Sequence, residues 1–169
     1  MKLLAFDTSS RILTVAGMND QGLVTEVALG GAVFQHAENL FPLIAQVLAN
    51  LKLDIARLDG YVAGLGPGSF TGLRIGLAAL KGFVASRPKP VYGISSLDLI
   101  AQGIPAVSPR LGVAVNARRQ KIYACFYEAR GGAWARLSGE DEILSPAEFA
   151  ARLGPDAAAT GDALDEYGA

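Results

Sequence analysis

The most informative stretch of the sequence reads Gly64-Leu65-Gly66-Pro67-Gly68-Ser69-Phe70-Thr71-Gly72-Leu73-Arg74-Ile75-Gly76. It joins a short apolar run, predicted to be a buried strand over 60–64, to an apolar segment predicted to be a helix over 72–85. A glycine loop that leads into a helix N-terminus can hold an anion, because free N–H groups and the helix dipole point to the same place. The loop lacks the Gly-Lys-Ser/Thr ending of a nucleoside-triphosphate P-loop, and it does not match the dinucleotide fingerprint. On the loop alone, we favour the simpler interpretation of a tight turn with close packing.

Upstream of this loop, three short runs of β-forming residues are separated by turn signals. They cover 3–6, 12–18 and 23–29, and Gly30-Gly31 closes the last one. Short runs spaced in this way predict an antiparallel meander.

The apolar period then changes to three and four residues, which predicts a helix with one apolar stripe. The stripe consists of Leu40, Leu43, Ile44, Val47, Leu48 and Leu51. Pro42 lies inside the pattern, so we expect the helix to begin near it. After the second helix, Arg87-Pro88-Lys89-Pro90 predicts a break, followed by a strand over 91–94 and a short helix capped by Ser95 or Ser96.

The order begins again after a linker over 103–109. Strands are predicted over 111–115, 122–127, 133–137 and 157–161, and Ser145-Pro146-Ala147-Glu148 is a strong helix start. The repeated order suggests an α/β fold in two lobes, the duplicated actin-like (ASKHA, ribonuclease-H-like) architecture. We place the lobes at 1–103 and 104–169, and we expect the second copy to be incomplete.

Composition limits the classes of function. The chain has 169 residues, of which 51% are hydrophobic and 18% charged, and its formal net charge is −1. A protein that binds RNA by itself usually has more basic than acidic residues. This chain does not, and only a local basic patch is available, around Arg118, Arg119 and Lys121. One cysteine, no membrane-length apolar run and no signal peptide together predict a cytoplasmic protein without an internal disulfide.

Few residues could carry metal chemistry. His36 is the only histidine and Cys125 the only cysteine, whereas a zinc site needs about three or four such ligands. We therefore predict no metal site and no catalytic set in this chain, with His36 at a helix start or on the surface and Cys125 in the core.

Asp7 ends the first strand, where a carboxylate of an actin-like protein would face a nucleotide. The corresponding place in the second half holds Asn116, whose amide cannot act as a base. We therefore predict at most a vestigial nucleotide or anion cleft, with a strand-ending turn as the simpler alternative. The cleft candidates are Asp7, Thr8, Ser9, Gly66, Gly68, Ser69 and Thr71.

The helix over 72–85 has small residues on one side and a leucine stripe beside it. Such a helix packs tightly, either on its own sheet or on a helix from another chain. We predict a partner interface from this helix and the one over 41–51. Its members are Phe41, Ile44, Leu48, Gly72, Leu73, Gly76, Leu77 and Leu80.

Four stretches resemble the TsaB (YeaZ) family most clearly, and the resemblance as a whole covers nearly all of the chain. The stretch 66–76 matches in unbroken register, and 3–9, 36–42 and 91–97 are also similar. The resemblance implies a non-catalytic relative of TsaD that supports N6-threonylcarbamoylation of a tRNA adenosine next to the anticodon. It also implies docking on TsaD through the N-terminal helices, recruitment of TsaE, a homodimer when alone, and contact with tRNA only through the complex. ATP and metal are expected on the partner subunits.

One feature agrees with a non-catalytic relative, and two others depart from what the resemblance implies. The active relative has a His-x-x-x-His metal pair, but Leu40 stands four residues after His36. Asn116 replaces the usual Asp, and the chain is shorter than most members. Two other functions remain open: a small-molecule kinase or phosphatase that uses Asp7 and the glycine loop, and, less favoured because ligands are missing, a metallopeptidase.

Overall fold

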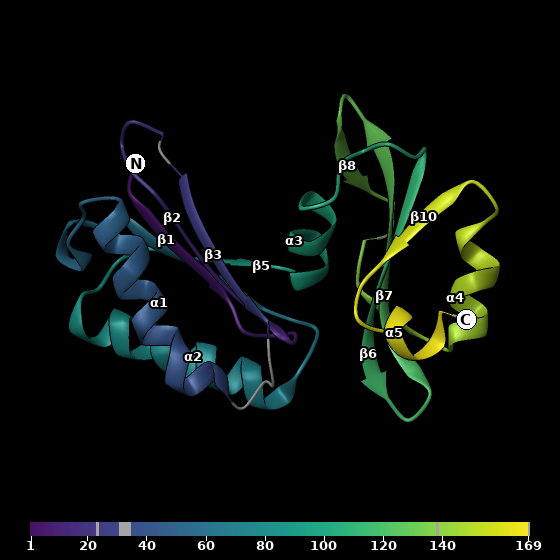
Figure 1. The fold of residues 1–169 in the computed structure, drawn as a ribbon, viewed down its shortest axis with the longest axis horizontal. Helices are drawn as coiled ribbons and strands as arrows, with labels where there is room; N and C mark the ends of the chain where they lie inside the picture. The colour runs from purple at the N-terminus through teal and green to yellow at the C-terminus, as the bar shows by residue number, and fades with distance from the viewer. Residues whose placement is uncertain (23, 31–34, 138, 169) are drawn as a thin grey trace. The chain divides into compact units, whose positions relative to one another are not determined.

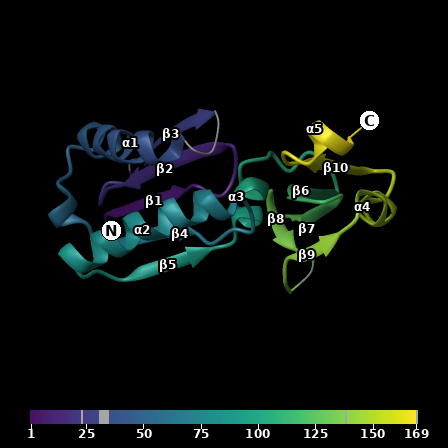
Figure 2. The ribbon, with the colours of Figure 1, turned by 90° about the horizontal axis from the view of Figure 1, so that it is seen from below.

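The first sheet is a meander extended by two parallel strands. We describe a computed structural model that covers residues 1–22, 24–30, 35–137 and 139–168. Strands β1 (Leu3–Asp7), β2 (Ile12–Met18) and β3 (Val24–Gly30) run antiparallel. Strands β4 (Gly60–Gly64) and β5 (Val91–Ile94) are parallel to β1 and give the order β3-β2-β1-β4-β5 (Figure 2). The predicted strands are confirmed, although Leu23 and Gly31 lie outside the described residues.

Two helices cover one face of this sheet (Figure 1). Helix α1 (His36–Asn50) lies mainly over β2 and β3, and α2 (Phe70–Ser86) lies over β4 and β1. The core between helices and sheet includes Leu4, Phe6, Val15 and Tyr61 from the strands. A short 3₁₀ helix, η2 (Ile55–Arg57), precedes β4.

The two helix starts differ from the prediction. Helix α1 begins at His36, so Pro42 lies inside the helix rather than at its start. Helix α2 begins at Phe70, two residues before the predicted start, because the Ser69 hydroxyl caps it by accepting the N–H of Gly72 at 3.2 Å.

The second sheet repeats the first over four strands. Its order is β10-β6-β7-β8, and β9 pairs with β7 beyond this path. The strands are β6 (Arg110–Arg118), β7 (Lys121–Arg130), β8 (Ala133–Arg136), β9 (Glu142–Leu144) and β10 (Ala157–Thr160). Since β6, β7 and β8 are antiparallel and β10 is parallel to β6, they correspond to β1, β2, β3 and β4. The predicted duplicated actin-like fold is confirmed, whereas β9 was not predicted.

Three helices accompany this sheet, namely α3 (Ser96–Gln102), α4 (Pro146–Leu153) and α5 (Leu164–Tyr167). Helix α3 buries Leu97 and Ala101 against one apolar cluster, and α4 buries Phe149 against a second one that contains Phe126. The predicted helix start at Ser145 is a complete capping box with Glu148.

The chain divides into two units, Met1–Ile94 (unit 1) and Ser95–Ala169 (unit 2). The predicted boundary lay at 103/104, but α3 packs on β6, β7 and β8 and therefore falls in unit 2. Within the described residues, no helix combines the length and apolar character needed to cross a membrane.

Candidate functional site

The glycine loop closes onto the end of β1. A Cβ added at Gly64 would lie 2.3 Å from a carboxylate oxygen of Asp7, and one at Gly68 would lie 2.2 Å from the Ser9 carbonyl oxygen. The N–H of Ser69 donates to that same carbonyl at 2.6 Å. These glycines are therefore required by close approach of the loop to the strand end.

Polar groups at the end of β1 are satisfied within unit 1. The Thr8 hydroxyl donates to the Gly72 carbonyl at 2.8 Å, and the N–H of Ser9 donates to the Asp7 carboxylate at 2.6 Å. Asp7, Thr8 and Ser9 are all buried.

The structure thus brings most of the predicted cleft residues together. Gly66 has a φ of +83° and packs near the Leu73 side chain, while Thr71 is exposed on the first turn of α2. The backbone of Ser69 and Gly72 bonds to Ser9 and Thr8, which follow β1, and the N–H of Gly72 also bonds to the Ser69 cap. These contacts favour the packing interpretation over an anion cradle.

Asn116 is bonded within unit 2, near the end of β6. Its backbone N–H donates to Asp162 at 2.8 Å, and its side-chain amide donates to Glu166. Its side-chain oxygen accepts the N–H of Arg118 at 2.7 Å. The residue therefore fixes the turn after β6 and the start of α5.

His36 and Cys125 both lie inside their units. His36 is the first residue of α1, it is buried, and its Nε2 lies 2.8 Å from the Ser10 carbonyl oxygen, to which the ring donates. Cys125 is fully buried in β7, with the guanidinium of Arg136 at 3.0 Å from its sulfur. Among the described residues, no group of three or more His, Cys, Asp or Glu side chains is placed to hold a metal ion.

Half of the predicted partner interface is buried inside unit 1. Ile44 and Leu80 belong to its core, and Gly72 and Gly76 face inward as well. At Gly76 an added Cβ would lie 2.4 Å from the Thr8 hydroxyl oxygen. The small-residue side of α2 therefore packs on its own sheet, and we correct the prediction by removing these four residues from the contact surface.

The other predicted members remain accessible to different degrees. Phe41 is 54% exposed and Leu77 is 50% exposed, while Leu48 and Leu73 are half-buried. The prediction missed Phe70, which is 74% exposed at the start of α2 with the Arg74 guanidinium over its ring. Phe70 stands three and seven residues before Leu73 and Leu77, so helical spacing does place it beside them. It was missed because the helix was predicted to begin only at Gly72, which left Phe70 in the loop. We call Phe41, Leu48, Phe70, Leu73 and Leu77 the α1–α2 surface.

Several known proteins are similar to this chain in sequence and in fold. The family model for TsaD, tRNA N6-adenosine threonylcarbamoyltransferase, matches residues 27–162. An uncharacterized protein from Mycobacterium tuberculosis is 36% identical over 153 residues, which are 88% of this chain and 65% of that protein. The tRNA threonylcarbamoyladenosine biosynthesis protein TsaB from Haemophilus influenzae is 32% identical over 127 residues, 73% of this chain and 52% of that protein. YeaZ from Pseudomonas aeruginosa has a TM-score of 0.80 at 24% identity, over 95% of this chain and 84% of that one.

The repeated sheet order and the loop at the end of β1 define an actin-like α/β protein. The chain belongs to the TsaB (YeaZ) family, which is related to TsaD. It spans 65% of the M. tuberculosis relative and 52% of the H. influenzae TsaB, so it corresponds to less than two thirds of these proteins.

Proposed function

We propose that the chain acts as a non-catalytic scaffold subunit in N6-threonylcarbamoylation of a tRNA adenosine next to the anticodon. Membership of the TsaB family carries this proposal, since relatives of that name are tRNA threonylcarbamoyladenosine biosynthesis proteins. In this role the chain docks on TsaD, recruits TsaE, and forms a homodimer when it is alone.

The α1–α2 surface supports the docking part of the proposal. Phe41 is exposed on α1, and Phe70 and Leu77 are exposed on α2, which contacts α1. Exposed large apolar side chains mark sites of association where a partner covers them. Phe41 packs edge-on against Phe83 at 5.9 Å, so its ring is held in place before a partner arrives.

The chemistry of the reaction belongs to the partners in this proposal. ATP and metal are bound by partner subunits, and tRNA is reached only through the complex, in the cytoplasm. The chain carries a net charge of −1, which agrees with a subunit that does not hold RNA on its own.

Reconstitution tests the proposal. Purified TsaD and TsaE are combined with ATP, a threonylcarbamoyl-adenylate donor and unmodified tRNA, with and without this chain, and the modified nucleoside is measured by mass spectrometry. We expect product formation to depend on the chain, and we expect the chain alone to turn over no ATP. Equal product without the chain, or ATP turnover that Asp7→Asn abolishes, would contradict the proposal.

A further inference from the structure

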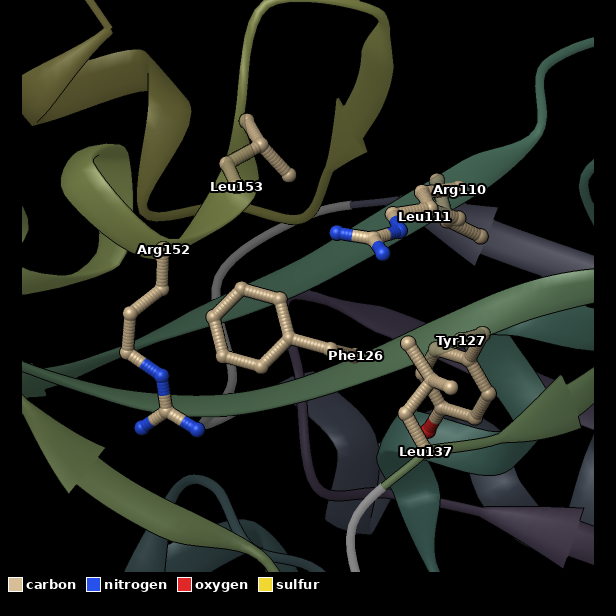
Figure 3. A pocket seen from close by; sticks show the side chains of 7 residues that line it. All are labelled: Arg110, Leu111, Phe126, Tyr127, Leu137, Arg152 and Leu153. Carbon is tan, nitrogen blue, oxygen red and sulfur yellow. The ribbon is translucent and has the colours of Figure 1, made fainter.

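A small cavity opens in unit 2 between β6, β7, the end of β8 and the end of α4 (Figure 3). Its apolar wall consists of Leu111, Phe126, Leu137 and Leu153. The volume is about 170 Å³, and an apolar cavity of about 150 Å³ is known to admit benzene. A single aromatic ring or a branched aliphatic group is therefore the largest body that fits.

Phe126 is held rigidly at the centre of this wall. Its ring stacks on Phe149 with centroids 5.3 Å apart, and the Arg152 guanidinium lies 4.9 Å from its centroid. Arg152 is in turn fixed by Glu142, whose two oxygens accept from it at 2.6 and 2.9 Å. This ion pair is neutral overall, so Arg152 shapes the cavity without giving it a net charge.

Arg110 is the second cation that lines the cavity, and it differs from Arg152 in having no ion-pair partner among the described residues. Figure 3 shows its guanidinium extended into the space beside Phe126 and Leu153. Within the described part of the chain it has no hydrogen-bond or ion-pair partner. Glu128 lies opposite it on β7, but that carboxylate pairs with Arg130. The charges around the cavity therefore sum to one uncompensated positive charge at Arg110.

We propose that this cavity binds a small monocarboxylate with an aromatic or branched aliphatic body. The body packs against Phe126 and Leu153, and the carboxylate accepts two hydrogen bonds from Arg110, the geometry that guanidinium groups favour. The site lies entirely within unit 2 and is independent of the proposed scaffold role.

The probe is 3-phenylpropionate, titrated into the ¹⁵N-labelled 169-residue chain and followed by amide chemical shifts. The uncharged analogue 3-phenylpropan-1-ol tests the role of the carboxylate. Acetate, which lacks the aromatic ring, tests the role of the apolar part of the ligand. We expect saturable shifts around residues 110–111, 126–127 and 152–153, with a dissociation constant in the low-millimolar range. The alcohol should bind about tenfold more weakly, because a charge-assisted bond is lost, and acetate should not saturate.

Two variants complete the test. Arg110→Gln should abolish the difference between acid and alcohol, and it should fold because Arg110 is exposed. Arg119→Gln, an exposed cation on the turn between β6 and β7, should bind like the wild type. The proposal is overturned if no shifts saturate, if they map elsewhere, if the alcohol binds as tightly as the acid, or if folded Arg110→Gln keeps the preference. Should Arg110→Gln fail to fold, the comparison of acid and alcohol on the wild type decides.

Discussion

The glycines of the loop and of α2 differ in whether a larger residue could replace them. An added Cβ at Gly68 meets the backbone of Ser9, which cannot rotate away as a side chain can. Gly82, in the C-terminal part of α2, has nothing within 4 Å of the same position. Glycine is therefore required at 68 by close approach, whereas at 82 it only costs helix stability.

Alanine at these two positions should have opposite effects. We expect Gly68→Ala to lower the free energy of unfolding by about 1–3 kcal/mol, as other steric conflicts with a fixed backbone do. Gly82→Ala should raise it by about 0.5–1 kcal/mol, the difference in helix propensity. Urea unfolding followed by circular dichroism measures both, and equal effects of the two changes would contradict the account.

The Glu142–Arg152 ion pair should make the stability of unit 2 depend on pH. Hydrogen bonding to Arg152 lowers the pKa of Glu142 below its ordinary value of 4.5. The pair therefore stabilises unit 2 fully above pH 4.5, and this contribution disappears as the pH falls through the lowered pKa. Both side chains are partly exposed, so solvent screening keeps this contribution small.

Glu142→Gln isolates this contribution. We expect the variant to be less stable than the wild type at pH 7 and to match it only once the pH is well below the lowered pKa of Glu142. Fluorescence of Trp134, the single tryptophan of the chain and buried in unit 2, reports the unfolding. A stability difference that stays constant with pH would show that the carboxylate acts by packing rather than by charge.

At the level of elements, the start of α4 was predicted from its capping residues, whereas the start of α2, which is also capped by a serine, was placed two residues too late. The Ser145 hydroxyl accepts the N–H of Glu148 at 3.2 Å, and the Glu148 carboxylate accepts the N–H of Ser145 at 2.7 Å. Both partners of this capping box are visible in the sequence, so the start of α4 was predicted correctly. The start of α1 was predicted wrongly from Pro42. A proline at a solvent-facing helix position removes only one backbone hydrogen bond, and the flanking apolar residues still pack, so the helix continues through it.

Loss of the cap should weaken unit 2. We expect Ser145→Ala to lower the free energy of unfolding by about 1 kcal/mol, the usual cost of removing an N-cap. Ser108→Ala, in the connection before β6, is the matched control and should have an effect within about 0.5 kcal/mol. Trp134 fluorescence during urea unfolding measures both variants; indistinguishable curves for Ser145→Ala and the wild type would rule out a stabilising cap.

For the whole molecule, the repeat of element order was sufficient to predict the fold class, by analogy with the actin-like architecture. Short elements without a pattern were not predictable, and β9 has only three residues. Only half of the residues predicted for the partner surface are accessible. Helical spacing identifies the apolar sides of a helix, but it does not tell which side packs on the helix's own sheet. Gly76 illustrates this limit, since the side that resembled a contact between chains packs on Thr8.

The proposed scaffold role makes its sharpest prediction at the α1–α2 surface. Gly76→Arg is unsuitable as a probe, because the added side chain would collide with Thr8 inside unit 1. Leu77→Asp is suitable: Leu77 is 50% exposed, so unit 1 should fold, while a charge placed in an apolar contact lacks a partner. Val107→Asp is the control, since Val107 is 86% exposed in unit 2.

We expect Leu77→Asp to weaken the homodimer and the capture of TsaD by at least about tenfold, the loss typical of a central contact residue. Sedimentation of the chain alone and a TsaD pull-down measure these affinities, with circular dichroism as the test of folding. Reconstituted tRNA modification should fall in parallel, while Val107→Asp leaves all three measurements unchanged. If folded Leu77→Asp dimerises and captures TsaD as the wild type does, the docking surface lies elsewhere on the chain. Such a result would leave the scaffold role itself to be decided by the dependence of tRNA modification on the wild-type chain.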